Sequence, residues 1–382
     1  MPFASIFAVL FTPALPEIAK LLDVSNSEIQ ATMTVFLLGY ALGNLPYGPI
    51  AKRFGRKPAI YLGITLAILG SFLTLFAGEQ HFFYLFLVGR FLSALGSSVG
   101  MKISFTMIGD TFKQAQATKK LSLTTLAFAV APGLAVGIGG FLTARFGWQS
   151  CFYTMIAYSF VLLILSYFLP ETAPHLDKQA LNFKNIQQTY QRELRNKKFL
   201  YPSLIMGFFT SIIYLFSTLA PFLAINEMGL SPEEYGFLNF IPPLGMIAGS
   251  FTAHSLAVRK KKLTVIQIGG VIAAISTLFM LGLFALGKIN LWTLFLPIPF
   301  IYFGGSLVFN NASSLAMQNA HDKSNGAAIM SFINILVAAS AVFVVQHIDS
   351  PTPLLMPLLF LFFILFLLGL QRQLQKNSTC SS

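Results

Sequence analysis

The feature that most constrains this chain is a succession of apolar segments, each long enough to cross the hydrocarbon core of a bilayer. A helix needs roughly 20 apolar residues to span about 30 Å of hydrocarbon, and runs of that length follow one another along most of the 382 residues. Charged residues make up only 10% of the chain, against roughly 25% in soluble domains. Because so little charge cannot cover a water-exposed surface, we predict an all-α integral membrane protein.

The apolar runs predict about 12 transmembrane helices in two sets of six. The first set is expected near residues 2–20, 28–50, 59–78, 82–108, 121–144 and 148–169, and the second near 199–225, 234–257, 263–286, 291–317, 325–346 and 353–371. Part of the polar stretch between the sets either forms an amphipathic helix at the membrane surface or is a flexible connection. The expected domains are an N-terminal six-helix bundle (1–169), a cytoplasmic linker (170–198), a C-terminal six-helix bundle (199–371) and a cytoplasmic tail (372–382).

Lys and Arg are divided unevenly between alternate loops. Of the 25 basic residues, 20 lie in loops on one side of the predicted membrane, and only Lys20, Arg145 and Lys288 lie in loops on the other. Cytoplasmic loops hold the excess, so we expect a multi-pass protein of a bacterial cytoplasmic (inner) membrane with both termini in the cytoplasm. Since the basic residues form short clusters between apolar runs, the net charge of +12 indicates topology and not nucleic-acid binding. The basic turn at 52–57 recurs at 259–262, which suggests a duplicated six-helix unit.

Several motifs of the first set occur in a fixed order. They are the proline-rich segment Pro13 to Pro16, the loop Gly48 to Pro58 (GPIAKRFGRKP), the segment Gly89 to Gly96 (GRFLSALG) and the segment Ala131 to Gly140 (APGLAVGIGG). This series resembles the major facilitator superfamily, and within it the bicyclomycin and chloramphenicol resistance (Bcr/CflA) branch of drug exporters. The resemblance covers most of residues 10–172 and implies two six-helix bundles that transport a solute.

The loop between the second and third helices resembles the most specific signature of the superfamily. Gly48 and Gly55 permit a tight turn. Arg53, Arg56 and Lys57 are expected to bind helix C-terminal carbonyls or carboxylates when the cytoplasmic side closes. The alternative is that these residues only anchor the chain on the cytoplasmic side.

The predicted fifth helix carries Pro132, Gly133, Gly137 and Gly140, which resemble the antiporter motif of the family. The proline removes a backbone hydrogen bond, and the glycines allow a neighbouring helix to approach closely. We therefore expect a bend at the interface between the two halves. Kinked packing without a role in exchange is the alternative.

Arg90 lies well inside the predicted fourth helix. A guanidinium in the bilayer costs at least about 2.5 to 3.5 kcal/mol on insertion scales, so we expect it to face the bundle interior, with the small residues Ser93 and Ser97 on the same helical face. Lys102 lies about 18 Å further along the helix toward the cytoplasm. We expect both cations to line the substrate path. The alternatives are that Arg90 binds backbone carbonyls and that Lys102 extends to the inner membrane surface.

Two positions depart from the resembled branch. Lys52 stands where an Asp is usual, and Val9 stands where proton-coupled exporters keep an acidic residue. All 13 acidic residues fall in loops or at predicted helix ends. A cavity with positive and no negative charge favours a neutral or anionic substrate. It leaves proton coupling to the substrate itself, to Lys102, or to Glu28 or Asp110, and uncoupled facilitation is a further alternative.

Other polar side chains in the predicted spans are candidates for the substrate path, because polar side chains in lipid-bounded helices tend to face inward. Many such residues only bond neighbouring helices, so we expect about half of them to line the path. The candidates are Tyr40, Asn44, Tyr214, Asn239, Asn310, Asn311 and Asn334.

These patterns predict a secondary transporter that moves a small organic solute across the cytoplasmic membrane by alternating access. The resemblance favours drug or metabolite efflux, whereas the charge pattern favours an anionic metabolite or a carboxylate-type siderophore, in either direction. A non-transporting membrane sensor or scaffold is an alternative of another class. No constellation for catalysis or metal binding occurs in the predicted bundles, so we expect no enzyme activity, no cofactor and no metal. The expected partners are the substrate, the lipid bilayer and protons as coupling ion, with no nucleic acid, and the expected state is a monomer.

Overall fold

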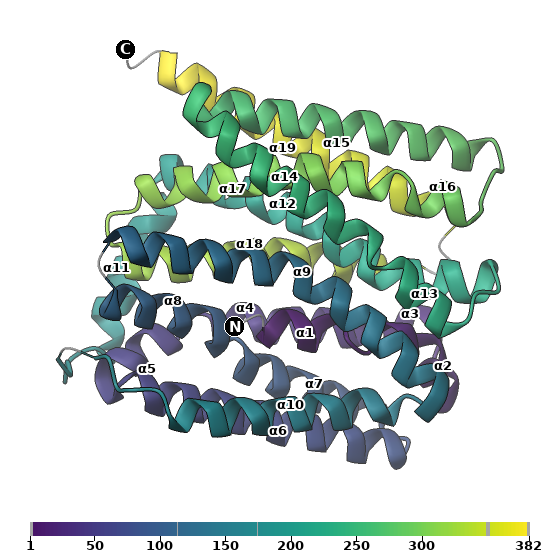
Figure 1. Cartoon of the computed structure of the whole chain (residues 1–382), viewed down its shortest axis with the longest axis horizontal. Helices are drawn as coiled ribbons and strands as arrows, with labels where there is room; N and C mark the ends of the chain where they lie inside the picture. Colours follow the sequence, from purple (N-terminus) through teal and green to yellow (C-terminus); the bar gives the residue numbers. More distant parts are fainter. Residues whose placement is uncertain (1–2, 113, 174, 349–351, 380–382) are drawn as a thin grey trace.

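The computed structural model describes residues 3–112, 114–173, 175–348 and 352–379, and in these ranges it is built from helices without strands (Figure 1). The elements up to residue 195 are α1 (Phe3–Val9), η1 (Thr12–Ala14), α2 (Leu15–Leu21), α3 (Asn26–Ile29), α4 (Ala31–Gly43), α5 (Tyr47–Phe54), α6 (Arg56–Glu79), α7 (Phe83–Ser97), α8 (Val99–Thr111), α9 (Gln114–Phe146), α10 (Gln149–Tyr167) and α11 (Phe183–Arg195). The later elements are α12 (Lys197–Pro221), η2 (Phe222–Glu227), α13 (Pro232–Leu238), α14 (Ile241–Arg259), α15 (Lys262–Ala285), α16 (Leu291–Phe295), α17 (Ile298–Gln318), α18 (Lys323–Val345) and α19 (Leu355–Thr379). Lys113 of a predicted basic loop and residues 380–382 of the predicted tail lie outside the described residues.

Within the described ranges, nine helical segments are long and apolar enough to cross a membrane. The other three predicted spans are also helical. Residues 28–50 are divided among α3, α4 and α5, residues 234–257 are divided between α13 and α14, and residues 121–144 lie within α9. Prolines explain the interruptions, because they lack the N–H that continues a helix: Pro46 precedes α5, and Pro242 lies in the first turn of α14.

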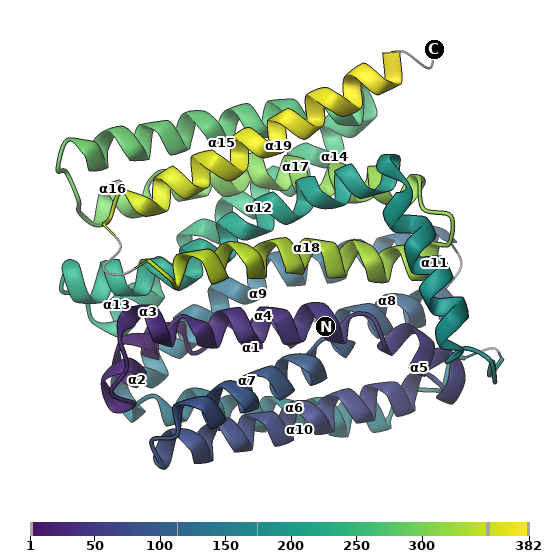
Figure 2. The same cartoon turned by 180° about the vertical axis from the view of Figure 1, so that it is seen from behind.

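The long helices lie side by side, and most of their contacts stay within the earlier or within the later helices (Figures 1 and 2). Among the earlier helices, α6 packs on α7 and α10, and α4 packs on α7; among the later ones, α17 packs on α14 and α15, and α12 packs on α18 and α19. The main contacts between these two sets are α18 with α4, and α13 and α14 with α9.

The start of the second predicted span and the start of the eighth carry the same local structure. Ser25 accepts a hydrogen bond from the backbone N–H of Glu28, whose carboxylate accepts one from the N–H of Ser25, and Ser231 and Glu234 repeat this capping box. Such a box satisfies free N–H groups at a helix start. Its recurrence at equivalent places supports a duplicated unit, in addition to the two basic turns.

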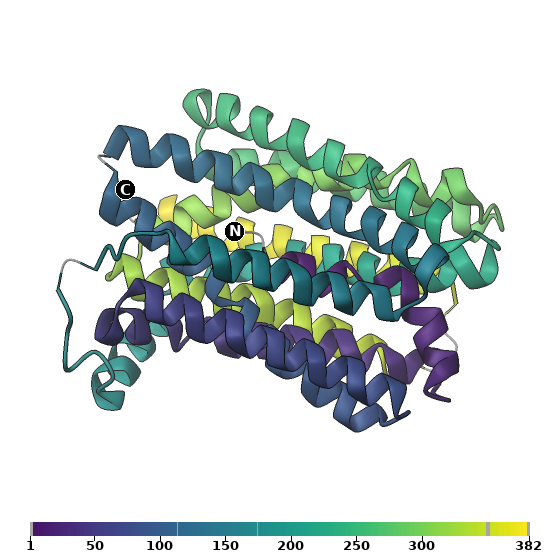
Figure 3. The ribbon, with the colours of Figure 1, turned by 60° about the horizontal axis from the view of Figure 1, so that its bottom comes forward.

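The linker between the two sets contains the helix α11. Figure 2 shows α11 crossing the ends of the long helices, and Figure 3 shows the segment before it extending outside the bundle. Tyr190 of α11 donates a hydrogen bond from its hydroxyl to the carbonyl of Leu45 at 3.1 Å. The buried carboxylate of Glu193 accepts the backbone N–H groups of His321 and Asp322, just before α18. Of the two alternatives for the linker, the structure has the helix.

Candidate functional site

A cavity of about 80 Å³ lies where helices of both sets meet. It is enclosed by residues of α1, α4 and α9 from the first set and of α12, α14, α17 and α18 from the second, together with Asn239 between α13 and α14. Its polar lining consists of Ser5, Tyr40, Thr210, Tyr214, Ser217, Asn239, Tyr302, Ser331 and Asn334. Its apolar lining includes Val9, Val136, Ile213, Phe216, Met246 and Phe309. Three prolines and one glycine within helices also line it, namely Pro132, Pro242, Pro243 and Gly133.

The lining contains no Asp, Glu, Lys, Arg or His among the described residues. Val9, at the place where the resembled exporters keep an acid, is one of the lining residues. Asp349 lies outside the described part of the chain, and the other acidic residues are in the linker, in loops or near helix ends. The expectation that acidic residues fall in loops or at helix ends therefore holds for the described residues.

Arg90 is completely buried in α7, but it does not line this cavity. Its Nη1 donates a hydrogen bond to the backbone carbonyl of Phe7 at 3.1 Å. Its guanidinium carbon lies 4.0 Å from the ring centre of Phe11 and 4.4 Å from that of Phe36. Nε and Nη2 have no hydrogen-bond partner among the described residues. The guanidinium thus joins α7 to α1 and α4 through one carbonyl and two aromatic faces, as in the backbone-binding alternative.

Lys102 and the two serines near Arg90 also lie outside the cavity lining. The ammonium of Lys102 donates to the backbone carbonyl of Asn44, at the break between α4 and α5. The hydroxyls of Ser93 and Ser97 donate to backbone carbonyls of their own helix. The positive charges expected to face the substrate are therefore used for helix-to-helix contacts in this structure, and the lining is uncharged.

The remaining asparagine candidates fall into two groups. Asn239 and Asn334 line the cavity with Tyr40 and Tyr214, whereas Asn44, Asn310 and Asn311 do not. Asn44 and Asn311 donate from their side chains to the carbonyl four residues earlier. Asn310 donates to the hydroxyl of Ser250 at 3.3 Å and so connects α17 to α14.

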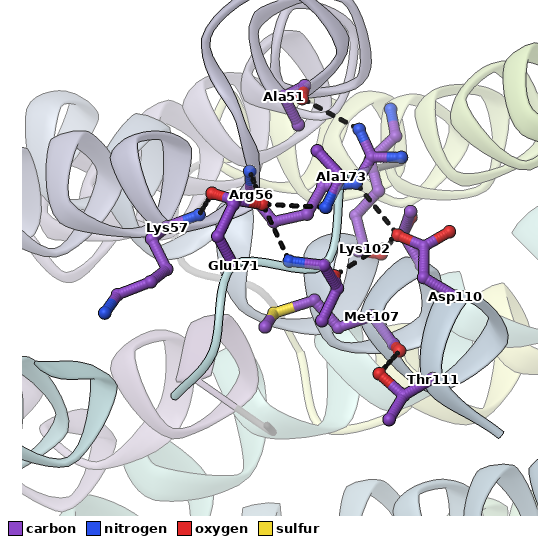
Figure 4. A network of polar contacts seen from close by, with 11 residues as sticks. Ala51, Arg56, Lys57, Lys102, Met107, Asp110, Thr111, Glu171 and Ala173 are labelled. Carbon is purple, nitrogen blue, oxygen red and sulfur yellow. Dashed lines mark hydrogen bonds and ion pairs between the residues drawn. The ribbon is translucent and has the colours of Figure 1, made fainter. Parts of the chain in front are cut away.

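The loop motif between α5 and α6 forms a network of polar contacts with two carboxylates, one from α8 and one from the segment after α10 (Figure 4). Arg56 Nε forms an ion pair with Asp110 of α8 at 3.1 Å, and its Nη1 donates to the carbonyl of Ala51 at 2.7 Å. Lys57 Nζ donates to the carbonyl of Tyr167, at the end of α10. Arg56 and Lys57 therefore bind helix C-terminal carbonyls and a carboxylate, as the charge of such helix ends favours.

Glu171 follows α10 and completes this network. Its carboxylate accepts the backbone N–H groups of Arg56, Lys57, Thr172 and Ala173. Partial burial acts to raise the pKa of Glu171, but the four N–H donors outweigh it, and the pKa lies below its ordinary value.

Gly55 makes this arrangement possible. Its φ of 106° lies in the region that favours glycine, and an added Cβ would lie 2.6 Å from Glu171 Oε2. Of the other loop residues, Gly48 faces the Lys102 side chain, and Arg53 places its guanidinium over the ring of Phe54. Lys52, at the position of the usual Asp, accepts the N–H of Asp177 with its backbone carbonyl. Asp110 and Glu171 supply the carboxylates that the loop itself lacks.

The glycines of α9 pack against the helices of the second set. An added Cβ at Gly133 would contact Pro243 and the carbonyl of Asn239, and one at Gly137 would contact the ring of Phe240. An added Cβ at Gly140 would lie 2.9 Å from the Cα of Gly236. Pro132 lies inside the same helix. The segment 132–140 therefore lies at the contact between the two sets of helices.

The comparisons with known proteins identify the family. The model described as Major Facilitator Superfamily matches residues 3–345. This chain belongs to the major facilitator superfamily. The superfamily consists of membrane transporters, so this member is a multi-pass transporter of a small molecule and not an enzyme.

Relatives of this facilitator include named drug-resistance proteins. A bicyclomycin resistance protein homolog of Haemophilus influenzae is 27% identical over 310 residues, which cover 81% of this chain and 77% of that protein. The multidrug resistance protein MdtL of Salmonella heidelberg is 30% identical over 311 residues, which cover 81% of this chain and 76% of that protein. The resemblance drawn from the motifs is confirmed.

The fold of this facilitator is similar to that of solved transporters. The partially occluded, inward-open xylose transporter XylE from E. coli matches 97% of this chain with a TM-score of 0.72, covering 96% of that chain at 14% sequence identity. A POT family transporter covers 99% of this chain and 95% of that chain, with a TM-score of 0.68 at 14% identity. The predicted fold class is thereby confirmed.

Several residues of the cavity and of the loop network were not predicted from the sequence of this facilitator. Tyr302 and Thr210 line the cavity, but in the sequence they lie within apolar runs without a motif. Glu171 was also missed, although its carboxylate accepts four N–H groups of the network. Its position directly after an apolar span, close to the basic loop on the same predicted side, was the available signal.

Proposed function

We propose that this protein exports small organic compounds of the drug or metabolite class across the bacterial cytoplasmic (inner) membrane by alternating access. The observation that carries this proposal is the position of the cavity between helices of the two sets, with α9 packed on α13 and α14 and α18 packed on α4. Rocking of one set against the other at these contacts would open the cavity to one side at a time. The drug-resistance names of the relatives support the class of compound.

We further propose the domain division and the orientation that the sequence predicts. The moving bodies would be residues 1–169 and 199–371, connected by the linker 170–198, with the tail 372–382 and both termini in the cytoplasm. The uneven division of basic residues supports this orientation. A monomer is sufficient for the mechanism, because a single chain supplies every lining residue of the cavity.

We also propose protons as the coupling ion, and the structure leaves fewer residues that could carry them than the sequence suggested. Asp110 is paired with Arg56, and Glu28 is held in its capping box, and neither lines the cavity. Lys102 also lies outside the lining, but its ammonium binds only the carbonyl of Asn44 among the described residues, and it is the carrier of the chain that we propose. Protonation of the substrate itself and uncoupled facilitation are the alternatives.

The experiment is flux into liposomes that contain the purified protein, with and without an imposed pH gradient, for a panel of radiolabelled drug-like compounds. The blocking variant is Gly140→Leu, because its side chain would separate α9 from Gly236 at the contact between the halves. The matched control is Gly282→Leu in α15, where no atom lies within 4 Å of an added Cβ. We expect flux in the wild type and in Gly282→Leu and its loss in Gly140→Leu, with the three proteins equally monodisperse in detergent.

Two results would contradict the proposal. Absence of flux for every compound would favour a non-transporting sensor or scaffold. Selective flux of polycarboxylates would favour the second candidate function, transport of an anionic metabolite or siderophore. The observation in favour of that candidate is Arg90, whose Nε and Nη2 lack partners among the described residues and are able to bind an anion that displaces the aromatic side chains.

A further inference from the structure

We propose that the cavity selects uncharged solutes that carry an amide-like pair, a hydrogen-bond acceptor and a hydrogen-bond donor, on a largely apolar body. This inference rests on the proposed transport function, and it names the substrate class that the same cavity would take. It is carried by the orientation of two asparagine side chains, by three tyrosine hydroxyls and by the absence of charge in the lining.

Asn334 of α18 offers the cavity a donor. The hydroxyl of Thr210 on α12 donates to Asn334 Oδ1 at 2.7 Å, so the amide oxygen is already engaged by a neighbouring helix. The amide nitrogen has no acceptor among the described residues. Because it is not one of the fully enclosed polar atoms that lack a partner, it is accessible from the cavity. Nδ2 therefore reaches the cavity with two free N–H groups.

Asn239, between α13 and α14, offers the opposite group. Its Nδ2 donates to the carbonyl of Tyr235 at 2.7 Å, which fixes the orientation of the amide. Because Nδ2 is engaged in this way, Oδ1 is the amide atom that Asn239 presents to the cavity. A bound solute would thus meet one oriented donor and one oriented acceptor, both belonging to the second half.

Three tyrosines add hydroxyls that are able to donate or accept. Tyr40, Tyr214 and Tyr302 line the cavity, and none of their hydroxyls bonds to a group in the described part of the protein. Because Tyr40 belongs to the first half, a solute that binds it together with Asn239 or Asn334 would connect the two halves.

The rest of the lining disfavours a charged solute. An ion that leaves water needs an opposite charge or several hydrogen bonds in return, and the lining supplies no charged side chain among the described residues. Arg90 and Lys102 lie outside the lining and donate to the carbonyls of Phe7 and Asn44. The apolar side chains, including Phe216 and Phe309, would contact the hydrophobic part of an amide-bearing compound once movement of the two halves has widened the cavity.

The test is equilibrium binding of three radiolabelled probes with one common body to the purified protein. They are N-acetylphenylalanine amide, which is uncharged, N-acetylphenylalanine, which is an anion, and N,N,N-trimethylphenylalanine amide, which is a fixed cation. We expect the uncharged probe to bind at least about tenfold more tightly than either ion. Equal or tighter binding of an ion would overturn the inference, and so would the absence of binding by all three while the wild type transports other compounds. If flux of every compound is also absent, the proposed function fails with it.

Variants locate the recognition groups. Asn334→Leu and Asn239→Leu should each weaken binding of the uncharged probe by about fivefold to tenfold, as for the loss of one buried hydrogen bond. Asn311→Leu is the matched control, since Asn311 makes the same bond to a carbonyl four residues earlier without lining the cavity, and it should leave binding unchanged. Unchanged binding in both Asn334→Leu and Asn239→Leu would overturn the inference. Asn334→Asp should invert the preference in favour of the cation, a gain that misfolding cannot produce.

Discussion

Two arginines of the first half, Arg56 and Arg90, are both almost fully buried, but their surroundings differ. Arg56 lies at the start of α6, where Asp110 provides a carboxylate and Ala51 a carbonyl, beside a second carboxylate at Glu171. Arg90 lies among apolar side chains, where its contacts are one carbonyl and two aromatic rings. The positive charge of Arg56 is thus neutralised by a carboxylate that is partly exposed to water. Among the described residues, the positive charge of Arg90 is stabilised only by a backbone carbonyl and two aromatic rings.

This difference has a consequence for function. The ion pair between Arg56 and Asp110 can break and form again when the two halves move, because water can solvate the separated charges. A guanidinium enclosed between rings has no such alternative, so Arg90 is expected to hold α1, α4 and α7 together throughout transport. The substrate cavity beside it remains uncharged.

The largest expected effect is that of Arg90→Ala. Removing the side chain leaves a cavity between Phe11 and Phe36 and should destabilise the protein by about 3 to 5 kcal/mol, with loss of transport. Arg90→Met, which fills the space without a charge, should recover most of the stability, because apolar replacements of buried ions are often neutral. Thermal unfolding in detergent measures both. Equal destabilisation by Ala and Met would mean that the charge itself is required.

The next effect concerns the ion pair of Arg56. Asp110→Asn should destabilise the protein by about 1 to 3 kcal/mol, since the side chains of Arg56 and Asp110 are only 9% and 20% exposed. A double-mutant cycle with Arg56→Gln measures the coupling, which should be at least about 0.5 kcal/mol. Additive effects of the two substitutions would show that the pair does not act as a unit.

A smaller effect is expected from the rings. Phe36→Leu keeps an apolar side chain but removes one aromatic face from Arg90 and should cost about 1 to 2 kcal/mol. Phe54→Leu is the control, because Phe54 also lies near a guanidinium, that of Arg53, but is 54% exposed. The control should change the unfolding temperature very little. An equal shift in both variants would assign the effect to apolar area alone.

The smallest effect is the acid dependence contributed by Glu171. Its folded pKa lies below the ordinary value of 4.5 because backbone N–H groups stabilise the carboxylate. The contribution to stability is therefore complete above the ordinary pKa and is lost as the pH falls through the lowered folded pKa. Unfolding temperatures should show no contribution from Glu171 to any change between pH 7 and 5. Below about pH 4, the wild type should lose stability more steeply than Glu171→Gln. Parallel curves for the two proteins would argue against this role.

The sequence was sufficient for the helical segments, the family and the composition of the loop network. Apolar length locates a span because hydrocarbon excludes unpaired backbone groups, and the motif around Arg56 predicted contacts with carbonyls and a carboxylate. It could not identify which carboxylates, since Asp110 belongs to another helix and Glu171 to the segment after α10. Of the residues predicted for the substrate path, Tyr40, Tyr214, Asn239 and Asn334 lie in the cavity lining, whereas Arg90 and Lys102 do not.

The sequence by itself determined a transporter-type membrane protein with uneven basic loops and no acidic residue in the middle of a predicted span. Only the tertiary structure decided that Arg90 binds Phe7 and the rings and that the amides of Asn239 and Asn334 present opposite groups to the cavity. The physical reason is that a helix with apolar residues on all sides has no polar stripe in its sequence to fix its rotation. In a membrane, the packing of neighbouring helices sets that rotation.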